Sequence, residues 1–335
     1  MKKLAKNALK TIFPLLLGVC ILVWVYWDFD FSKVKDILLH GMNWWWMIAS
    51  LFFGVFSQVV RGWRWLLTLE PLHVYPKKAN SVNAVFISYA ANLILPRVGE
   101  ISRCGVLTKY DGISFAKSFG TVVTERLIDS LCVLMITGIA VIAQITIFNR
   151  FFKATGTDIG SITETFTSMH FYIILICTVA VLILLFYLIR TLSFFEKVKG
   201  VVLNIWEGII SLRRVKNIPL FLLYTFLIWF CYFMQFFLTL YCFSFTSALG
   251  PWAGLVLFVA GTLAVIVPTP NGAGPWHFAI ISMLTLYGVE ASNAGAFALI
   301  VHGVQTFLII LLGVFALITL PIINKKVLYE NNSGS

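Results

Sequence analysis

Apolar runs of spanning length recur from one end of this chain to the other, and they limit its fold more than any other feature. Hydrophobic residues make up 60% of the 335 residues, and charged residues only 12%. A helix needs about 20 mostly apolar residues to cross a bilayer, and lipid offers no partner to free backbone groups. The sequence therefore predicts an all-α integral membrane protein.

Six of these runs are predicted to be full spans. They cover residues 9–27, 44–66, 118–148, 169–190, 218–243 and 293–323. Two further regions, 79–117 and 251–288, are apolar but interrupted by proline and glycine at residues 96–99 and 268–275. Because proline removes a backbone donor and clashes with the preceding turn, each region is predicted to be a broken-helix hairpin.

The polar linkers 150–170 and 191–217 are too short to fold alone. We therefore expect one polytopic membrane domain over residues 1–325, followed by a flexible tail, 326–335. The first segment begins MKKLAKNALK. No small-residue cleavage site follows its apolar run, so it is interpreted as a retained anchor rather than a signal peptide.

Lysine and arginine placement predicts the orientation, since these residues concentrate in cytoplasmic loops. It places both termini in the cytoplasm if each hairpin enters and leaves on one side, the first from the cytoplasm and the second from outside. Residues 1–149 and 168–325 would then form an inverted repeat, a common transporter plan. The alternative is eight simple spans in which the proline and glycine clusters are ordinary kinks or loops.

Six of the nine charged side chains within residues 93–129 are singled out because they lie next to or inside apolar runs. A charge at membrane depth costs roughly 2.5–3.5 kcal/mol on insertion scales, so it commonly marks a binding site or a pathway. These residues are Arg97, Glu100, Arg103, Glu125, Arg126 and Asp129. Arginine presents a fork of donors that fits phosphate, so Arg97, Arg103 and Arg126 are predicted to bind a headgroup.

The three acidic residues are predicted to orient the arginines or to carry a proton. Glu100 could pair with either neighbouring arginine at i, i+3 spacing. Asp129 could form an internal pair with Arg126, which leaves Glu125 for Arg97, for Arg103 or for a proton.

The second break is predicted to complete the site. Gly272 and Gly274 permit unusual backbone angles, and Pro275 suits the first turn of a new half-helix. The free N–H groups of that helix start, with His277 beside them, would favour an anion. The alternative is a tight turn that buries a hydrogen-bonded histidine.

Other polar residues have plainer interpretations. Arg61 and Arg64 lie among tryptophans and are expected to snorkel to the interface. His302 and Gln305 share one face of the last span and either line the cavity or hydrogen-bond between helices. No nucleophile–base pair, zinc spacing or nucleotide motif occurs, so no catalytic residue, metal or cofactor is predicted, and binding or transport is favoured over catalysis. The net charge of +11 follows the span ends and does not indicate nucleic acid.

The order Asn92, Pro96-Arg97-Val98-Gly99-Glu100, Arg103, then Glu125-Arg126 and Asp129, then the break at 268–274, resembles the lysylphosphatidylglycerol synthase transmembrane-region family, also called flippase-like proteins. The resemblance implies a membrane domain that flips a lipid, and it adds Asn92 to the candidate substrate-binding residues. In bifunctional members a separate cytoplasmic domain makes the aminoacyl lipid. That domain is not in this sequence.

One departure bears on the substrate. The family's second break usually reads Pro-Gly-Gly-x-Gly followed by a glutamate, whereas here Asn271 replaces a glycine and His277 the acid. This favours an anionic phosphate group over a cationic lysyl headgroup. We therefore expect a translocase of phospholipids or polyprenyl-phosphate carriers in the cytoplasmic (inner) cell membrane. The alternatives are a membrane enzyme acting on a lipid-linked substrate and a non-transporting scaffold for a synthase. A separate cytoplasmic synthase or a second copy of the chain is a possible partner.

Overall fold

The computed structural model describes residues 2–27, 29–147 and 215–325. Every regular element within these ranges is a helix. The predicted span 169–190, most of both polar linkers and the tail 326–335 lie outside the described residues.

Within the described ranges, three long helices are apolar enough to cross a membrane. They are α6 (Phe115–Ala143), α11 (Ile218–Phe237) continued by the 3₁₀ turn η4 (Leu238–Cys242), and α14 (Ala291–Ile323). At a rise of 1.5 Å per residue, α14 is about 50 Å long, more than the roughly 30 Å hydrocarbon core needs. The apolar helices predicted over 218–243 and 293–323 are confirmed, and the one predicted over 118–148 is confirmed as far as Ala143, where α6 ends.

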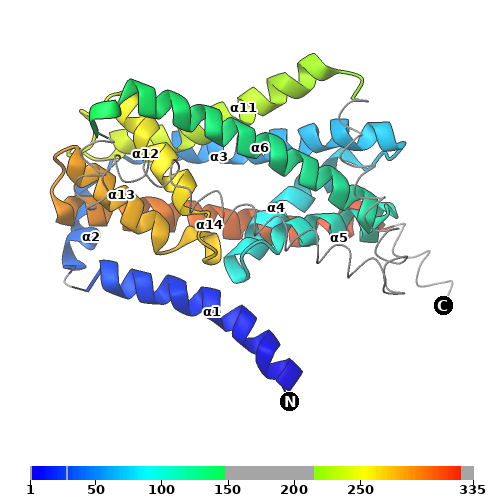
Figure 1. Ribbon diagram of the computed structural model, residues 1–335, viewed down its shortest axis with the longest axis horizontal. Helices are drawn as coiled ribbons and strands as arrows, with labels where there is room; N and C mark the ends of the chain where they lie inside the picture. The colour runs from blue at the N-terminus through cyan, green and yellow to red at the C-terminus, as the bar shows by residue number, and fades with distance from the viewer. Residues whose placement is uncertain (1, 28, 148–214, 326–335) are drawn as a thin grey trace, which may run out of the picture.

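The N-terminal part forms two more helices. α1 (Lys2–Val25) lies beside the rest of the molecule in Figure 1, and α3 (Trp44–Leu69) runs through it. Asn43 caps α3, because its side chain accepts a hydrogen bond from the Trp45 amide. Short turns fill the connections: α2 (Ser32–Asp36), η1 (Ile37–Gly41) and η2 (Glu70–Leu72).

The first interrupted region is a pair of helices, as predicted. α4 (Lys78–Ile94) ends two residues before Pro96, and α5 (Gly99–Asp111) begins just after it. Arg97 takes a left-handed backbone angle, with φ of 66°. The Gly99 amide donates to the Asn92 side chain at 2.8 Å, which ties the start of α5 to α4.

The second interrupted region is broken as predicted too. α12 (Pro251–Ala264) ends before Pro268, the first proline of the break. A 3₁₀ turn η5 (Pro270–Gly272) follows, and α13 (Pro275–Leu286) starts at a proline. Asn271, Gly272 and Gly274 all have positive φ, of 51°, 72° and 92°. Such angles favour glycine and tolerate asparagine, so the sequence determines this turn locally.

The two broken regions lie toward opposite ends of the long axis, α4 and α5 at one end and α12 and α13 at the other (Figure 1). Their tips meet in between, where Arg97 Nη2 donates to the Ile266 carbonyl at 3.3 Å. α14 packs against both α4 and α13. This is the geometry that two opposed hairpins would have, while re-entry into the membrane and the inverted repeat stay predictions.

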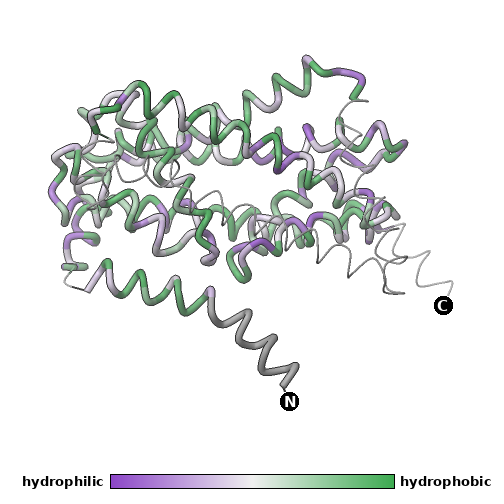
Figure 2. The backbone as a smooth tube through the Cα atoms, in the orientation of Figure 1, coloured by the Kyte–Doolittle hydropathy of each residue, from purple (hydrophilic) through white to green (hydrophobic). Residues whose placement is uncertain are grey.

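Polarity is unevenly spread along the chain. Figure 2 shows mostly hydrophobic residues along α12 and α14, whereas a hydrophilic stretch interrupts α6 near its middle. That stretch contains Glu125, Arg126 and Asp129. It lies well inside a helix that is long enough to span a membrane, and charges in such a position commonly mark a functional site.

Candidate functional site

Two helices are joined by buried ion pairs around one aspartate. Arg64 Nη2 on α3 lies 2.9 Å from Asp129 Oδ1 on α6, and Arg61 Nη2 lies 3.1 Å from Asp129 Oδ2. Arg61 and Arg64 are 3% and 0% exposed. The prediction that they snorkel to the interface is therefore wrong. They face inward because Asp129 and Glu125 on the neighbouring helix supply the countercharge that a buried guanidinium requires.

A second set of pairs surrounds Glu125. Its carboxylate lies 3.0 Å from Arg103 Nη2 on α5 and 3.4 Å from Arg64 Nε, and it is fully buried. The Arg103 guanidinium also lies over the Trp65 ring, 3.9 Å from its centroid. Of the predicted partners of Glu125, Arg103 is confirmed. The same contacts hold α3, α5 and α6 together.

Arg126 completes the cluster from a more open position. Its Nη2 lies 3.2 Å from Asp129 Oδ2, which confirms the predicted internal pair, and its side chain is 41% exposed. Among the residues that the structure describes, four guanidinium groups thus face two carboxylates. The excess of two positive charges inside an apolar protein favours the binding of an anion.

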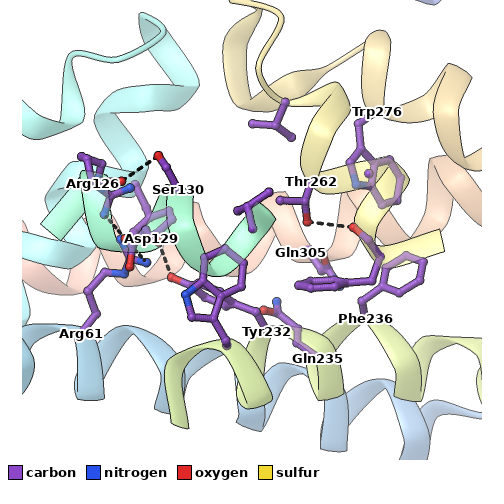
Figure 3. Close-up of a pocket in the computed structure, with 16 residues that line it drawn as sticks. Arg61, Arg126, Asp129, Ser130, Tyr232, Gln235, Phe236, Thr262, Trp276 and Gln305 are labelled. Atoms are coloured by element: carbon purple, nitrogen blue, oxygen red, sulfur yellow. Dashed lines mark hydrogen bonds and ion pairs between the residues drawn. The ribbon is translucent and has the colours of Figure 1, made fainter. Parts of the chain in front are cut away.

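A cavity of about 440 Å³ opens beside this cluster. Figure 3 shows Arg61, Arg126, Asp129 and Ser130 together at one end of it. Tyr232 lies between them and the second end, and its hydroxyl is hydrogen-bonded to that of Tyr89. The second end is lined by neutral side chains, namely Gln235, Phe236, Thr262, Trp276 and Gln305.

Several buried donors at this cavity have no partner among the described residues. Arg61 Nε and Nη1, Arg126 Nε, Trp229 Nε1 and Gln305 Nε2 make no hydrogen bond to any described residue. All four residues line the cavity. Since a buried donor without a partner costs about 1–3 kcal/mol, such a group of donors is typical of a site that binds oxygen atoms of a ligand.

The first break lies outside the cavity lining. Arg97 is exposed and holds the Ile266 carbonyl, and Asn92 holds the Gly99 amide. Glu100 makes no ion pair within the described ranges, so the predicted pairing with Arg97 or Arg103 is not found, and its Oε2 is buried without a partner. These residues shape the contact between the two tips.

Backbone amides of the second break donate hydrogen bonds to groups within the same break. The Gly272 amide donates to the Thr269 carbonyl at 3.2 Å, and the Gly274 amide to His277 Nδ1 at 3.4 Å. Neither amide is therefore a free donor for a ligand. His277 is 3% exposed and its ring lies 4.6 Å from that of His302, so its contacts are those of the alternative interpretation, a buried hydrogen-bonded histidine.

On α14, His302 and Gln305 each fit a different one of their two interpretations. Gln305 lines the cavity. His302 instead makes a contact of 3.1 Å from Nε2 to the Asn271 carbonyl, and the Asn271 side chain donates to Thr306 at 3.0 Å. α14 thus braces the second break through His302 and Thr306 and contributes Gln305, which lies between them in the sequence, to the cavity.

The sequence matches the lysylphosphatidylglycerol synthase TM region over residues 11–313. The chain belongs to this family. It is accordingly a membrane-embedded protein of a lipid-related family. No curated protein and no solved structure matches it.

Sequence reasoning missed part of the site of this lysylphosphatidylglycerol synthase TM-region protein. Arg61 and Arg64 are three residues apart, as an inward-facing pair on α3 requires, and this spacing could have been compared with that of Glu125 and Asp129 on α6. The aromatic and amide lining had no such signal. Tyr232 and Gln235 sit in a helix rich in aromatic residues, where nothing local separates cavity lining from core.

Proposed function

We propose that this protein is a lipid translocase that moves a lipid with a phosphate-containing headgroup between the leaflets of the cytoplasmic membrane. Phospholipids and polyprenyl-phosphate carriers are the candidate substrates. The observation that carries the proposal is the cavity of about 440 Å³ with excess positive charge and unpartnered arginine donors at one end.

Arg61 and Arg126 are the proposed phosphate ligands. Arg61 is fixed by Asp129 through one nitrogen, and its other two nitrogens remain without a hydrogen-bond partner. Its guanidinium also lies 5.5 Å from the centre of the Tyr232 ring. A donor group held in place in this way loses little conformational entropy when a ligand binds.

Arg103 takes a different role in this proposal from the one the sequence suggested. Its guanidinium is paired with Glu125, covered by Trp65 and absent from the cavity lining. It therefore positions α5 against α6. Arg61 replaces it as a proposed phosphate ligand. Arg97 is exposed at the contact between the tips, where it would act on the relative motion of the two hairpins.

Replacing Arg126 with glutamine should slow leaflet exchange. A hydrogen bond to a charged group contributes about 1.5–3 kcal/mol, so we expect the initial rate to fall by roughly tenfold to a hundredfold. The measurement uses purified protein in liposomes that contain a fluorescent phosphatidylglycerol, with a membrane-impermeant quencher added outside. Because the Arg126 side chain is partly exposed, the variant should keep its helical content and its elution volume.

Lys117→Gln is the matched control, since Lys117 lies on the same helix and makes no ion pair with a described residue. It should exchange lipid within about twofold of the wild-type rate. Wild-type exchange by Arg126→Gln would refute the role of Arg126 as a phosphate ligand, and no exchange by the unaltered protein would refute the translocase. A change in lipid mass during incubation would instead support the membrane enzyme.

A further inference from the structure

The neutral end of the cavity has a chemistry of its own. It is formed where α11, α12, α13 and α14 converge, by Gln235, Thr262, Trp276 and Gln305 respectively (Figure 3). Gln305 Nε2 is buried and donates to none of the described residues. Because no described residue accepts a hydrogen bond from this buried donor, a polar group of a ligand in the cavity would satisfy it.

Amide groups distinguish this end from the arginine end. A glutamine side chain both donates and accepts hydrogen bonds without a net charge, and so does a hydroxyl group. Thr262 uses its own donor on the Phe258 carbonyl, so its oxygen is left as an acceptor. Two amides and one acceptor oxygen therefore fit a ligand group that carries several hydroxyls.

The same lining does not suit a cationic group. A buried ammonium needs a carboxylate close by, and Asp129 is the one acidic residue that lines the cavity within the described ranges. Asp129 is already paired with three arginines, Arg61, Arg64 and Arg126. An aminoacyl extension would therefore meet positive charge at one end and neutral side chains at the other.

Trp276 gives this end a fixed flat wall. It is 9% exposed and packs over Gly261, where an added Cβ would come within 2.7 Å of the indole nitrogen. Its ring also stands edge-on to Phe236, with 6.4 Å between centroids. A rigid aromatic surface beside a few well-placed polar groups is typical of small-molecule sites, whose volumes of about 300–1,000 Å³ include that of this cavity.

We infer that the headgroup is a phosphate that carries a neutral, hydroxyl-bearing group, with the phosphate at Arg61 and Arg126 and the hydroxyls at Gln305 and its neighbours. This rests on the proposed function for the phosphate end. Glycerol in a phosphatidylglycerol and a sugar in a glycosyl-phosphate lipid share this chemistry.

Binding, measured apart from transport, tests the inference. Native mass spectrometry of the detergent-solubilised full chain would compare phosphatidylglycerol, phosphatidic acid and lysyl-phosphatidylglycerol with the same acyl chains, and a glycosyl-phosphate prenol against the unmodified prenyl phosphate. We expect each hydroxyl-bearing lipid to bind roughly three- to tenfold more tightly than its bare phosphate. We expect lysyl-phosphatidylglycerol to bind more weakly than phosphatidylglycerol. The pair with the larger preference identifies the source.

Gln305→Leu should remove that preference and leave phosphatidic acid binding unchanged. Gln58→Leu is the matched control, because Gln58 is also buried with an unpartnered side-chain atom but does not line the cavity. It should keep the preference. Equal binding of bare and hydroxyl-bearing lipids by the wild type, strongest binding of the lysyl lipid, or an equal loss for all lipids in Gln305→Leu would overturn the inference. Selective binding without leaflet exchange would refute the translocase and leave the inference about the headgroup intact.

Discussion

Replacing Glu125 with glutamine should destabilise the folded protein by about 3–5 kcal/mol, because it removes one partner of a fully buried pair. The Glu125 carboxylate is the countercharge nearest to Arg103 and one of two for Arg64, and all three side chains are almost completely buried. Glutamine keeps the shape and one acceptor oxygen but leaves both guanidinium groups short of negative charge. Equilibrium unfolding in mixed micelles measures the free-energy change.

Glu290→Gln provides the matched control for this prediction. Glu290 forms an ion pair with Lys33 at 3.7 Å, but the two side chains are 65% and 43% exposed. Exposed pairs contribute about 0–1 kcal/mol, so the control should unfold almost as the wild type does. Equal free energies of unfolding for Glu125→Gln and the wild type would show that the buried network does not hold α3, α5 and α6 together.

The positions of the helix breaks could be predicted from the sequence because local chemistry determines them. Pro96 and Pro275 fix where half-helices end and begin, and Gly272 and Gly274 take the positive φ that the second turn needs. Proline and glycine act through the backbone of their own segment. No knowledge of the neighbouring helices was needed to place these breaks.

The arginine partners could not be predicted in the same way. Arg61 and Arg64 sit beside Trp63 and Trp65, a composition that equally suits a membrane interface. Their burial follows from α6, which is more than fifty residues away along the chain and brings Glu125 and Asp129 opposite them. Whether the two arginines snorkel or form buried ion pairs depends on tertiary contacts with α6, and the sequence of α3 alone does not determine it.

The candidate site residues fall into two groups, and tertiary contacts again decide which residue belongs to which group. Arg126 and Gln305 line the cavity, whereas Asn92, Arg97 and His277 brace the two breaks. All of them are polar groups in apolar surroundings, so composition gave them one common interpretation. What separates them is whether a backbone group or an open cavity lies opposite, which depends on how the two tips meet.

Replacing Gly99 with alanine should separate the two helices of the first break. An added Cβ there would lie 2.2 Å from the Ser88 carbonyl oxygen and 2.8 Å from the Asn92 amide nitrogen. Backbone cannot move aside as a flexible side chain can, so α5 must shift away from α4. Overpacking of this kind costs about 1–3 kcal/mol, and the shift should also displace Arg97 from Ile266 and slow leaflet exchange.

Gly105→Ala, on the same helix, should change stability in the opposite direction. An added Cβ at Gly105 would meet nothing within 4 Å, and alanine favours a helix interior over glycine by about 0.5–1 kcal/mol. Unfolding measurements on both variants therefore separate close packing from helix propensity. If both alanines were stabilising, α4 and α5 could not be as closely packed as the Gly99–Ser88 contact requires. A stabilised Gly105→Ala with normal exchange, beside a destabilised and slow Gly99→Ala, would show that transport depends on the contact between α4 and α5 at the break.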